Sequence, residues 1–184
     1  MSECADLGLM RLSSPAEIDS ARFYLPHHAV FKSNEVRKIR VVFNASQRGS
    51  NGLSLNDLLL PGPKLQTDIT LVLTRWRFQK FAFVSDIVKM FRQILVDKRD
   101  WAWQYILWRC DASSPIQDFC ATTVTYGTAA APFLAIRTLL QLAQHGQLQF
   151  PTASATLRRQ IYVNDIFAGA DTLDDAMHCR NQII

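Results

Sequence analysis

Short runs of hydrophobic residues that alternate with polar ones predict β-strands in the first half of the chain. Residues 28–31 and 39–43 are two such runs, and the polar turn Ser33-Asn34-Glu35 between them predicts a hairpin. A third run, residues 81–86, is rich in aromatic and apolar side chains and ends abruptly on Asp86. We expect a strand there with a carboxylate at its last position.

Capping residues and the spacing of apolar residues predict where the helices begin. Ser14-Pro15-Ala16-Glu17 is a capping box with proline at the first helical position. After Thr67 or Asp68, apolar residues recur with the spacing of a helix that packs one face on a core. Two further helices are expected, one over residues 133–144 after Pro132 and one after Thr172 with its acidic first turn.

Three more segments have a composition typical of strands. Residues 101–108 are dense in aromatic side chains, and residues 121–125 are rich in threonine. Further on, residues 159–163 are largely β-branched and aromatic, Asn164-Asp165 supply turn chemistry, and residues 166–169 resume the apolar pattern. This last arrangement predicts a tight hairpin. The strands and helices together indicate an α+β fold.

The composition indicates a globular protein of the cell interior. Of the 184 residues, 48% are hydrophobic and 20% are charged, which suffices for a buried core in one domain or one two-lobed unit. No apolar stretch approaches the roughly 20 residues of a membrane span, and the start of the chain lacks a signal-peptide pattern. The four cysteines show neither zinc spacing nor a disulfide framework. We expect a cytoplasmic protein with reduced cysteines and no membrane partner.

Basic residues gather in the first predicted hairpin, although the net charge of the whole chain is only +4. One interpretation is a solvated basic face. The other, which we prefer, is contact with the phosphates of a nucleic acid or nucleotide. Basic side chains at alternate positions of a strand lie on one face, where they can bind phosphates together. The residues are Lys32, Arg37, Lys38, Arg40 and Arg48, and only Glu35 opposes them.

The tetrapeptide Tyr162-Val163-Asn164-Asp165 places polar residues inside an apolar run. One interpretation is that Asn164 and Asp165 merely make a turn. The other follows from Asp86, which ends an apolar strand far upstream. Two carboxylates at strand ends can meet across one sheet and bind a cation. The presence of the second acid favours this interpretation.

Three motifs, in this order and spacing, resemble motifs A, B and C of a reverse transcriptase. They are Phe83-Val84-Ser85-Asp86 with the residues to Phe91, Thr125-Tyr126-Gly127 with residues 128–133, and Tyr162-Val163-Asn164-Asp165. Other phrases are similar to the polymerase of Pao/BEL-type LTR retrotransposons, and these are Tyr24-Leu25-Pro26-His27-His28, Arg40-Val41-Val42-Phe43-Asn44-Ala45-Ser46, Asn56-Asp57-Leu58-Leu59-Leu60-Pro61-Gly62-Pro63 and Lys89-Met90-Phe91-Arg92-Gln93-Ile94.

The resemblance implies a right-hand polymerase fold, with fingers and a palm whose antiparallel sheet is backed by helices. On this basis we expect an N-terminal extension over residues 1–26, the fingers over residues 27–80 and the palm over residues 81–184. These parts would form one reverse transcriptase domain. The palm is expected to be truncated after motif C, and the thumb is expected to be absent.

The resemblance also implies an RNA-directed DNA polymerase that extends a primer 3′-hydroxyl on an RNA or DNA template with deoxynucleoside triphosphates. Asp86, the Ile87 carbonyl and Asp165 would hold two Mg²⁺ ions, with the motif C turn supplied by Tyr162 and Val163. Asn164 stands where the family has a catalytic acid. A carboxamide removes one negative charge from a site for two divalent ions, so we expect a catalytically impaired copy.

Further positions match residues that hold the incoming nucleotide in this family. The resemblance assigns Arg40 and Lys32 to the triphosphate and Phe91 to exclusion of the ribose 2′-hydroxyl. Tyr126 would lie against the base or ribose, and Gly127 would allow the backbone to approach the nucleotide or template closely. From the residues alone, Phe91 is equally a core aromatic and Lys32 a surface charge.

Two alternatives to an active polymerase remain open. One is a non-catalytic nucleic-acid-binding or structural remnant of a transposable element, which Asn164 and the expected truncation favour. The other is an unrelated nucleotidyltransferase or cyclase with a similar palm, which explains the two strand-end acids but not Tyr126-Gly127. An intact element would place the protein in a virus-like particle. The sequence predicts no oligomeric state.

Overall fold

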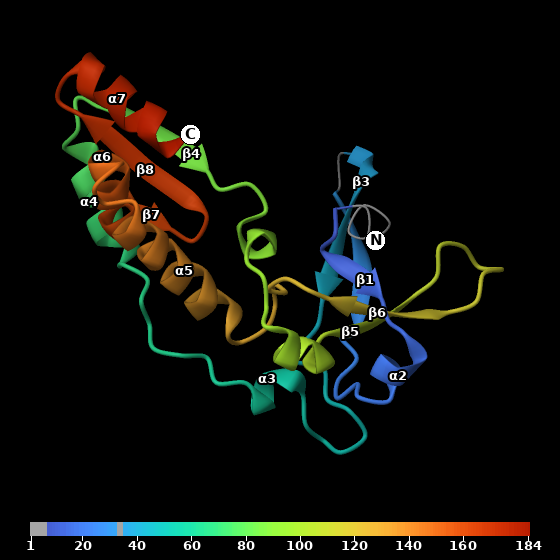
Figure 1. Cartoon of the computed structure of the whole chain (residues 1–184). Helices are drawn as coiled ribbons and strands as arrows, with labels where there is room; N and C mark the ends of the chain where they lie inside the picture. Colours follow the sequence, from blue (N-terminus) through green and yellow to red (C-terminus); the bar gives the residue numbers. More distant parts are fainter. Residues whose placement is uncertain (1–6, 33–34) are drawn as a thin grey trace. The chain divides into compact units, whose positions relative to one another are not determined.

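The chain folds into two compact units, each built from two separated stretches of sequence (Figure 1). The computed structural model describes residues 7–32 and 35–184, with the side chains of residues 32 and 35–38 not described. Unit 1 comprises Met1–Pro61 and Phe91–Ala131, and unit 2 comprises Gly62–Met90 and Pro132–Ile184. These ranges differ from the expected 27–80 and 81–184, and the assignment of fingers and palm stays a prediction.

Unit 1 contains a three-stranded antiparallel sheet and a separate two-stranded hairpin. The sheet has the order β1-β6-β5, and the hairpin joins β2 and β3. The elements are β1 (Met10–Leu12), α2 (Pro15–Ile18), β2 (His27–Lys32), β3 (Glu35–Phe43), α3 (Leu55–Leu58), η2 (Lys98–Trp103), β5 (Tyr105–Trp108) and β6 (Gln117–Ala121), while the 3-10 helix η1 (Met90–Gln93) begins at the last residue of the unit 2 stretch.

The predicted β2–β3 hairpin is confirmed. Its register pairs His28 with Val42 and Val30 with Arg40, so these residues share one face. The turn expected at Ser33-Asn34-Glu35 has its first two residues outside the described part of the chain. The predicted capping box at Ser14 is also present at the start of α2, with Glu17 as its acidic partner.

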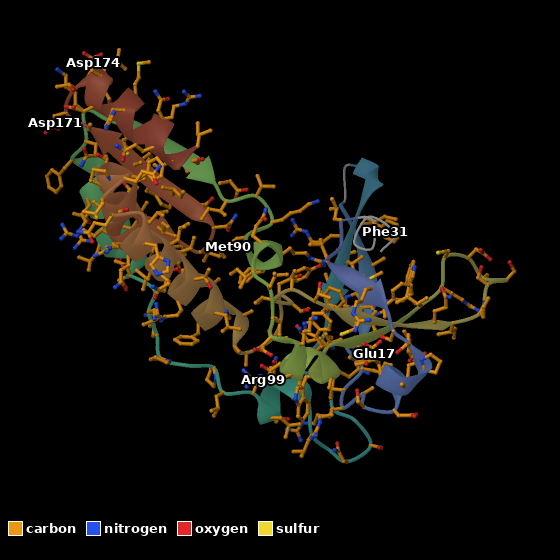
Figure 2. All side chains as sticks on the ribbon, viewed as in Figure 1. Glu17, Phe31, Met90, Arg99, Asp171 and Asp174 are labelled. Atoms are coloured by element: carbon orange, nitrogen blue, oxygen red, sulfur yellow. The ribbon has the colours of Figure 1, made fainter. Side chains whose placement is uncertain are left out.

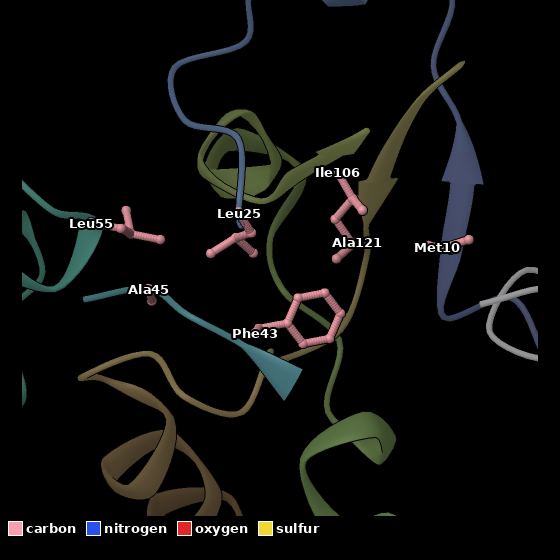
Figure 3. Close-up of a cluster of buried hydrophobic side chains, with 7 residues drawn as sticks. All are labelled: Met10, Leu25, Phe43, Ala45, Leu55, Ile106 and Ala121. Carbon is pink, nitrogen blue, oxygen red and sulfur yellow. The ribbon is translucent and has the colours of Figure 1, made fainter. Parts of the chain in front are cut away.

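The core of unit 1 draws its side chains from both stretches of sequence (Figure 3). All of its members are less than a tenth exposed, and Leu55 is fully buried. Such burial contributes about 1.5–3 kcal/mol for each large apolar side chain. The cluster contains Met10, Leu25, Phe43, Ala45, Leu55, Ile106 and Ala121.

The prediction of a strand over residues 101–108 is wrong for its first half. Residues Lys98–Trp103 form the 3-10 helix η2, and only Tyr105–Trp108 form strand β5. The side chain of Asp97 caps η2 by accepting a hydrogen bond from the Arg99 N–H at 3.0 Å. This local bond between side chain and backbone competes with a strand in a way that aromatic composition does not indicate.

The prediction of a strand over residues 121–125 is also wrong, because β6 ends at Ala121. Beyond that point the backbone leaves its ladder and bonds to two different segments. The N–H of Thr122 donates to the Leu9 carbonyl at 3.1 Å, and the N–H of Val124 donates to the Ile94 carbonyl at 2.9 Å. The backbone N–H groups of this segment therefore form hydrogen bonds with different segments, not with one neighbouring strand.

Unit 2 is an antiparallel sheet with helices packed against it. The sheet has the order β4-β8-β7, and α4, α6 and α7 contact it (Figure 1). The elements are α4 (Ile69–Arg77), β4 (Phe81–Asp86), α5 (Ala131–His145, whose first residue belongs to unit 1), α6 (Pro151–Arg159), β7 (Ile161–Tyr162), β8 (Asp165–Ala170) and α7 (Leu173–Ile183).

Most of the expected boundaries in unit 2 are confirmed. Strand β4 ends on Asp86, Asp68 caps α4, and Thr172 caps α7 through its side chain. Helix α6 was not expected, and its last residue is Arg159. The predicted strand over residues 159–163 is therefore shortened to the two residues of β7. Proline at the first position of α6 is the only local signal for this helix, since its N-cap Phe150 offers no side-chain bond.

Alternation along β8 separates the two faces of this sheet. Ile166 and Ala168 are buried, whereas Asp165 and Phe167 lie on the opposite face. Trp76 of α4 packs edge-on against Phe167, with ring centroids 5.6 Å apart. Its indole Nε1 also donates to two main-chain carbonyls of the sheet, both at 3.2 Å. Asp165 is thus placed by the packing of its own strand.

The structure combines helices with antiparallel sheets, as the α+β expectation states. Within the described residues, no helix has both the length and the apolar character needed to cross a membrane.

Candidate carboxylate site in unit 2

Two aspartates form the centre of the candidate site. Asp86, the last residue of β4, is paired directly with Asp165, the first residue of β8. Directly opposite residues in an antiparallel pair have Cβ atoms about 4.5–5.5 Å apart and share one face of the sheet. The expectation that two strand-end acids meet across one sheet is therefore met. Without a positive partner, two like charges in these positions repel.

The turn that precedes Asp165 differs from the expected one. Its central residues are Val163 and Asn164, and Asp165 already belongs to β8, where it pairs with Tyr162. Val163 has a φ of 55°, in the left-handed region that β-branched residues rarely adopt. Such a conformation costs of order 1–3 kcal/mol and persists only where surrounding contacts enforce it.

Gln66 supplies contacts that enforce this turn. Its side-chain Oε1 accepts a hydrogen bond from the Val163 N–H at 2.9 Å, and its Nε2 donates to the Ile161 carbonyl at 2.8 Å. Gln66 is not among the residues expected from the sequence, because a glutamine in a loop carries no pattern. Only the folded chain brings it to a hairpin almost a hundred residues away.

Asn164 binds the end of β4 through both its side chain and its backbone. Its amide Nδ2 donates to Asp86 Oδ1, and its carbonyl accepts a hydrogen bond from the Ile87 N–H at 2.8 Å. The side-chain amide of Asn164 therefore donates a hydrogen bond to Asp86, one of the two paired carboxylates. An aspartate at this position would instead add a third negative charge.

The residues present do not fit a pair of Mg²⁺ ions. Among the described residues there is no group of three or more His, Cys, Asp or Glu side chains that could hold a metal. Two carboxylates and one carboxamide leave too little negative charge for two adjacent divalent ions. The Ile87 carbonyl, expected as a metal ligand, accepts a hydrogen bond from the Met90 N–H at 3.2 Å. Its metal role stays a prediction.

The nucleotide-binding residues expected from the resemblance, Tyr126 among them, lie in unit 1. Tyr126 is half-buried, and its ring packs edge-on against Phe43 with centroids 5.4 Å apart. Its hydroxyl donates to the Val41 carbonyl, and the Arg92 guanidinium lies 5.2 Å from its ring centroid. These contacts give Tyr126 a role in joining β3 to the motif B loop. Contact with a base or ribose stays a prediction.

Gly127 has a φ of +90°, and a Cβ built on it would lie 2.8 Å from the Phe43 carbonyl oxygen. The backbone of Gly127 is therefore close to that of β3, and its expected close approach to the nucleotide or template stays a prediction. Asn56 fixes the same loop, because its Nδ2 donates to the Gly127 carbonyl at 3.1 Å and its Oδ1 accepts from the Ala129 N–H at 2.7 Å. No role is expected for Asn56 from the sequence, although it lies in one of the phrases quoted above for the resemblance.

The remaining expected residues also belong to unit 1, and their contact with a nucleotide stays a prediction. Arg40 is exposed on β3, and Phe91 is half-buried in η1. The side chain of Lys32 lies outside the described part of the structure. The structure thus brings Asp86, Ile87 and the Tyr162-Val163-Asn164-Asp165 turn together in unit 2, and it places Arg40, Phe91, Tyr126 and Gly127 in unit 1.

The fold of the chain is similar to that of part of a solved viral protease-reverse transcriptase. In fold, the chain is similar to the crystal structure of the protease-reverse transcriptase of prototype foamy virus, with a TM-score of 0.69 and 14% sequence identity. The match covers 99% of this chain and 20% of that chain, so the chain spans about a fifth of the length of that protein. No protein-family profile and no curated protein matches the sequence.

Proposed function

We propose that this chain is an RNA-directed DNA polymerase domain of a Pao/BEL-type LTR retrotransposon, in which Asn164 impairs catalysis. The observation that carries the proposal is the direct pairing of Asp86 with Asp165 at the ends of two strands, in a fold of retroviral polymerase type. The motif phrases around both acids support the same assignment. Its partners would be an RNA or DNA template-primer and deoxynucleoside triphosphates.

Polymerisation joins the primer 3′-hydroxyl to the α-phosphate of an incoming nucleotide, and divalent metal ions supply the charge stabilisation for this step when they are bound. In this chain, Asp86 and Asp165 offer carboxylate oxygens, while Asn164 donates a hydrogen bond to Asp86. These two carboxylates would hold at most one Mg²⁺ ion weakly, and turnover would therefore be slow. In unit 1, Arg40 and Lys32 would bind phosphates and Phe91 would select deoxyribose.

Primer extension on an RNA template tests this function. The wild-type chain, Asn164→Asp and the double variant Asp86→Asn/Asn164→Asp are compared in Mg²⁺ and in Mn²⁺. We expect Asn164→Asp to extend the primer at least about tenfold faster than wild type, a difference of roughly 1.4 kcal/mol in the barrier. The double variant should be inactive. Equal extension by wild type and Asn164→Asp would show that Asn164 does not limit this enzyme.

A second candidate function is a non-catalytic nucleic-acid-binding remnant. The hydrogen bond from the Asn164 amide to Asp86 favours it, because this bond stabilises the pair of aspartates without a metal ion. The two candidates separate in one comparison. A chain that binds RNA, and whose Asn164→Asp variant binds Mn²⁺ yet extends no primer, fits the remnant and not the impaired polymerase.

A further inference from the structure

A cleft in unit 1 has no role in the proposed chemistry. It has a volume of about 510 Å³ and lies where β1, α2 and the segment after α2 approach η2. Binding sites for small ligands typically have volumes of about 300–1,000 Å³. None of the metal or nucleotide-binding residues named above lines it. Figure 2 labels two of the lining residues, Glu17 of α2 and Arg99 of η2.

Cationic side chains outnumber carboxylates in the lining. Arg11, Arg22, Lys98 and Arg99 line the cleft, together with Glu17 and Asp19. The Glu17 carboxylate is engaged by the Arg11 guanidinium through two hydrogen bonds. The pKa of Glu17 is lowered to about 2, mainly by its bond to Arg11 and then by Ser14, so the pair stays fully charged at neutral pH.

Two of the four cationic side chains in the lining can bind an anionic ligand without first breaking an ion pair. Arg99 forms an ion pair with Asp97 at 3.0 Å, and Arg11 is paired with Glu17. For Arg22 and Lys98, by contrast, the described part of the chain provides no ion-pair partner. An anionic ligand is therefore not in competition with an internal carboxylate at these two side chains.

Aromatic rings hold these cations in place. The Arg11 guanidinium lies 4.8 Å and the Lys98 ammonium 5.9 Å from the ring centroid of Trp101. The indole of Trp101 is fixed by a hydrogen bond of 2.8 Å from its Nε1 to the Val96 carbonyl. Arg22 lies 5.5 Å from the ring centroid of Trp103. Cation–π contacts restrict such side chains without neutralising them.

The one thiol in the lining adds no negative charge. Burial raises the pKa of Cys120 to about 11, so the thiol is protonated at neutral pH. The cleft thus combines surplus positive charge with an indole ring at its wall. The surplus of positive charge suits a nucleic-acid strand, whose phosphates pair with cations, while the indole of Trp101 holds Arg11 and Lys98 in place.

We propose that this cleft of unit 1 binds the phosphates of single-stranded nucleic acid through Arg22 and Lys98. It would be a contact separate from the residues expected to hold the nucleotide and the metal. A free nucleotide carries the same phosphate chemistry, and competition with ATP distinguishes the two sources. An acidic peptide offers carboxylates in place of phosphates, and competition with poly-glutamate distinguishes it from a nucleic acid.

The test measures binding of a fluorescein-labelled RNA of about 12 nucleotides, within the usual range of site sizes. Anisotropy titrations are run at several salt concentrations for wild type and for Arg22→Gln/Lys98→Gln. The matched control is Lys64→Gln/Arg137→Gln, which removes the same charge from two exposed side chains of unit 2. A charge-preserving variant, Arg22→Lys/Lys98→Arg, checks that the site and not the fold is altered.

Each lost phosphate contact should reduce the slope of log K against log salt concentration by about 0.7 for a single strand. We expect a reduction of about 1.4 for Arg22→Gln/Lys98→Gln. The control and the charge-preserving variant should keep the wild-type slope. Equal losses in the site variant and the control, or none in either, would overturn the proposal. Competition by ATP or by poly-glutamate at an equal concentration of anionic groups would also overturn it.

This inference does not depend on turnover. A chain that never extends a primer, even as Asn164→Asp, leaves the difference in salt slope intact if the cleft binds RNA. Conversely, primer extension with an unchanged slope would support the polymerase and contradict the cleft. The two outcomes are therefore separable.

Discussion

Asp86 and Asp165 face each other directly across strands β4 and β8, and the amide of Asn164 donates a hydrogen bond to Asp86. Two carboxylates in this position repel unless a cation or a donor lies between them. Here the donor belongs to the chain itself. A metal ion that binds Asp86 through this oxygen would have to displace the internal hydrogen bond.

Removing one of the two charges should stabilise the protein. We expect Asp165→Asn to raise the free energy of unfolding by about 0.2–1 kcal/mol in metal-free buffer, because it relieves the repulsion across the strand pair. Urea denaturation with a chelator present measures this change. Asp171→Asn, which removes an exposed charge from the bend after β8, should have a smaller effect. A loss of stability in Asp165→Asn would contradict the repulsion.

Gly127 should be intolerant of any side chain. We expect Gly127→Ala to lower the free energy of unfolding by about 1–3 kcal/mol, because of its φ of +90° and the close Phe43 carbonyl. The control is Gly52→Ala, where φ is +77° but a Cβ would meet nothing within 4 Å. The control should cost only the backbone strain, about 1–2 kcal/mol. Equal losses would mean that the contact with β3 is unimportant.

Asn56 should hold the motif B loop through both ends of its amide. Asn56→Asp keeps the acceptor for the Ala129 N–H but loses the donor to the Gly127 carbonyl and to Ser46 Oγ. We expect a loss of about 1–3 kcal/mol in unfolding free energy for Asn56→Ala and a smaller loss for Asn56→Asp. Thermal denaturation measures both. Hydrogen exchange at the Ala129 amide should rise in Asn56→Ala, and unchanged exchange would contradict the role.

The bond between Arg11 and Glu17 should make stability depend on pH in acid. The folded pKa of Glu17 is lowered to about 2, below its usual value near 4.5. The contribution of ionised Glu17 to the free energy of unfolding is therefore present above about pH 4.5. It is lost as the pH falls toward 2. We expect the difference in thermal midpoint between wild type and Glu17→Gln to shrink across this range. A constant difference would show that ionised Glu17 does not contribute.

Local signals in the sequence were sufficient for several elements. The end of β4 at Asp86 and the start of α7 after Thr172 follow from side chains within a few residues of each boundary. That Asp86 and Asp165 lie opposite each other was also predictable, because each acid stands at the end of an apolar strand. The expected position of the turn was one residue too late in the sequence. The turn uses Val163, at a φ that β-branched residues rarely adopt.

Features that depend on distant partners were not predictable. Gln66 holds the hairpin turn, and Asn56 holds the motif B loop more than seventy residues away in sequence. Neither contact leaves a pattern in the sequence around it. Helix α6 was missed because only Pro151 marks its start. The bond from Asn164 to Asp86 required the folded sheet, although the substitution itself was visible.

In the proposed function, Asn164 limits the binding of divalent cations at Asp86 and Asp165. The most direct measurement is titration of Mn²⁺ into wild type and Asn164→Asp, followed by electron paramagnetic resonance of the free ion. We predict that Asn164→Asp binds Mn²⁺ at least about tenfold more tightly, roughly 1.4 kcal/mol, and that Asp86→Asn/Asn164→Asp loses this gain. Equal affinities of wild type and Asn164→Asp for Mn²⁺ would contradict the claim.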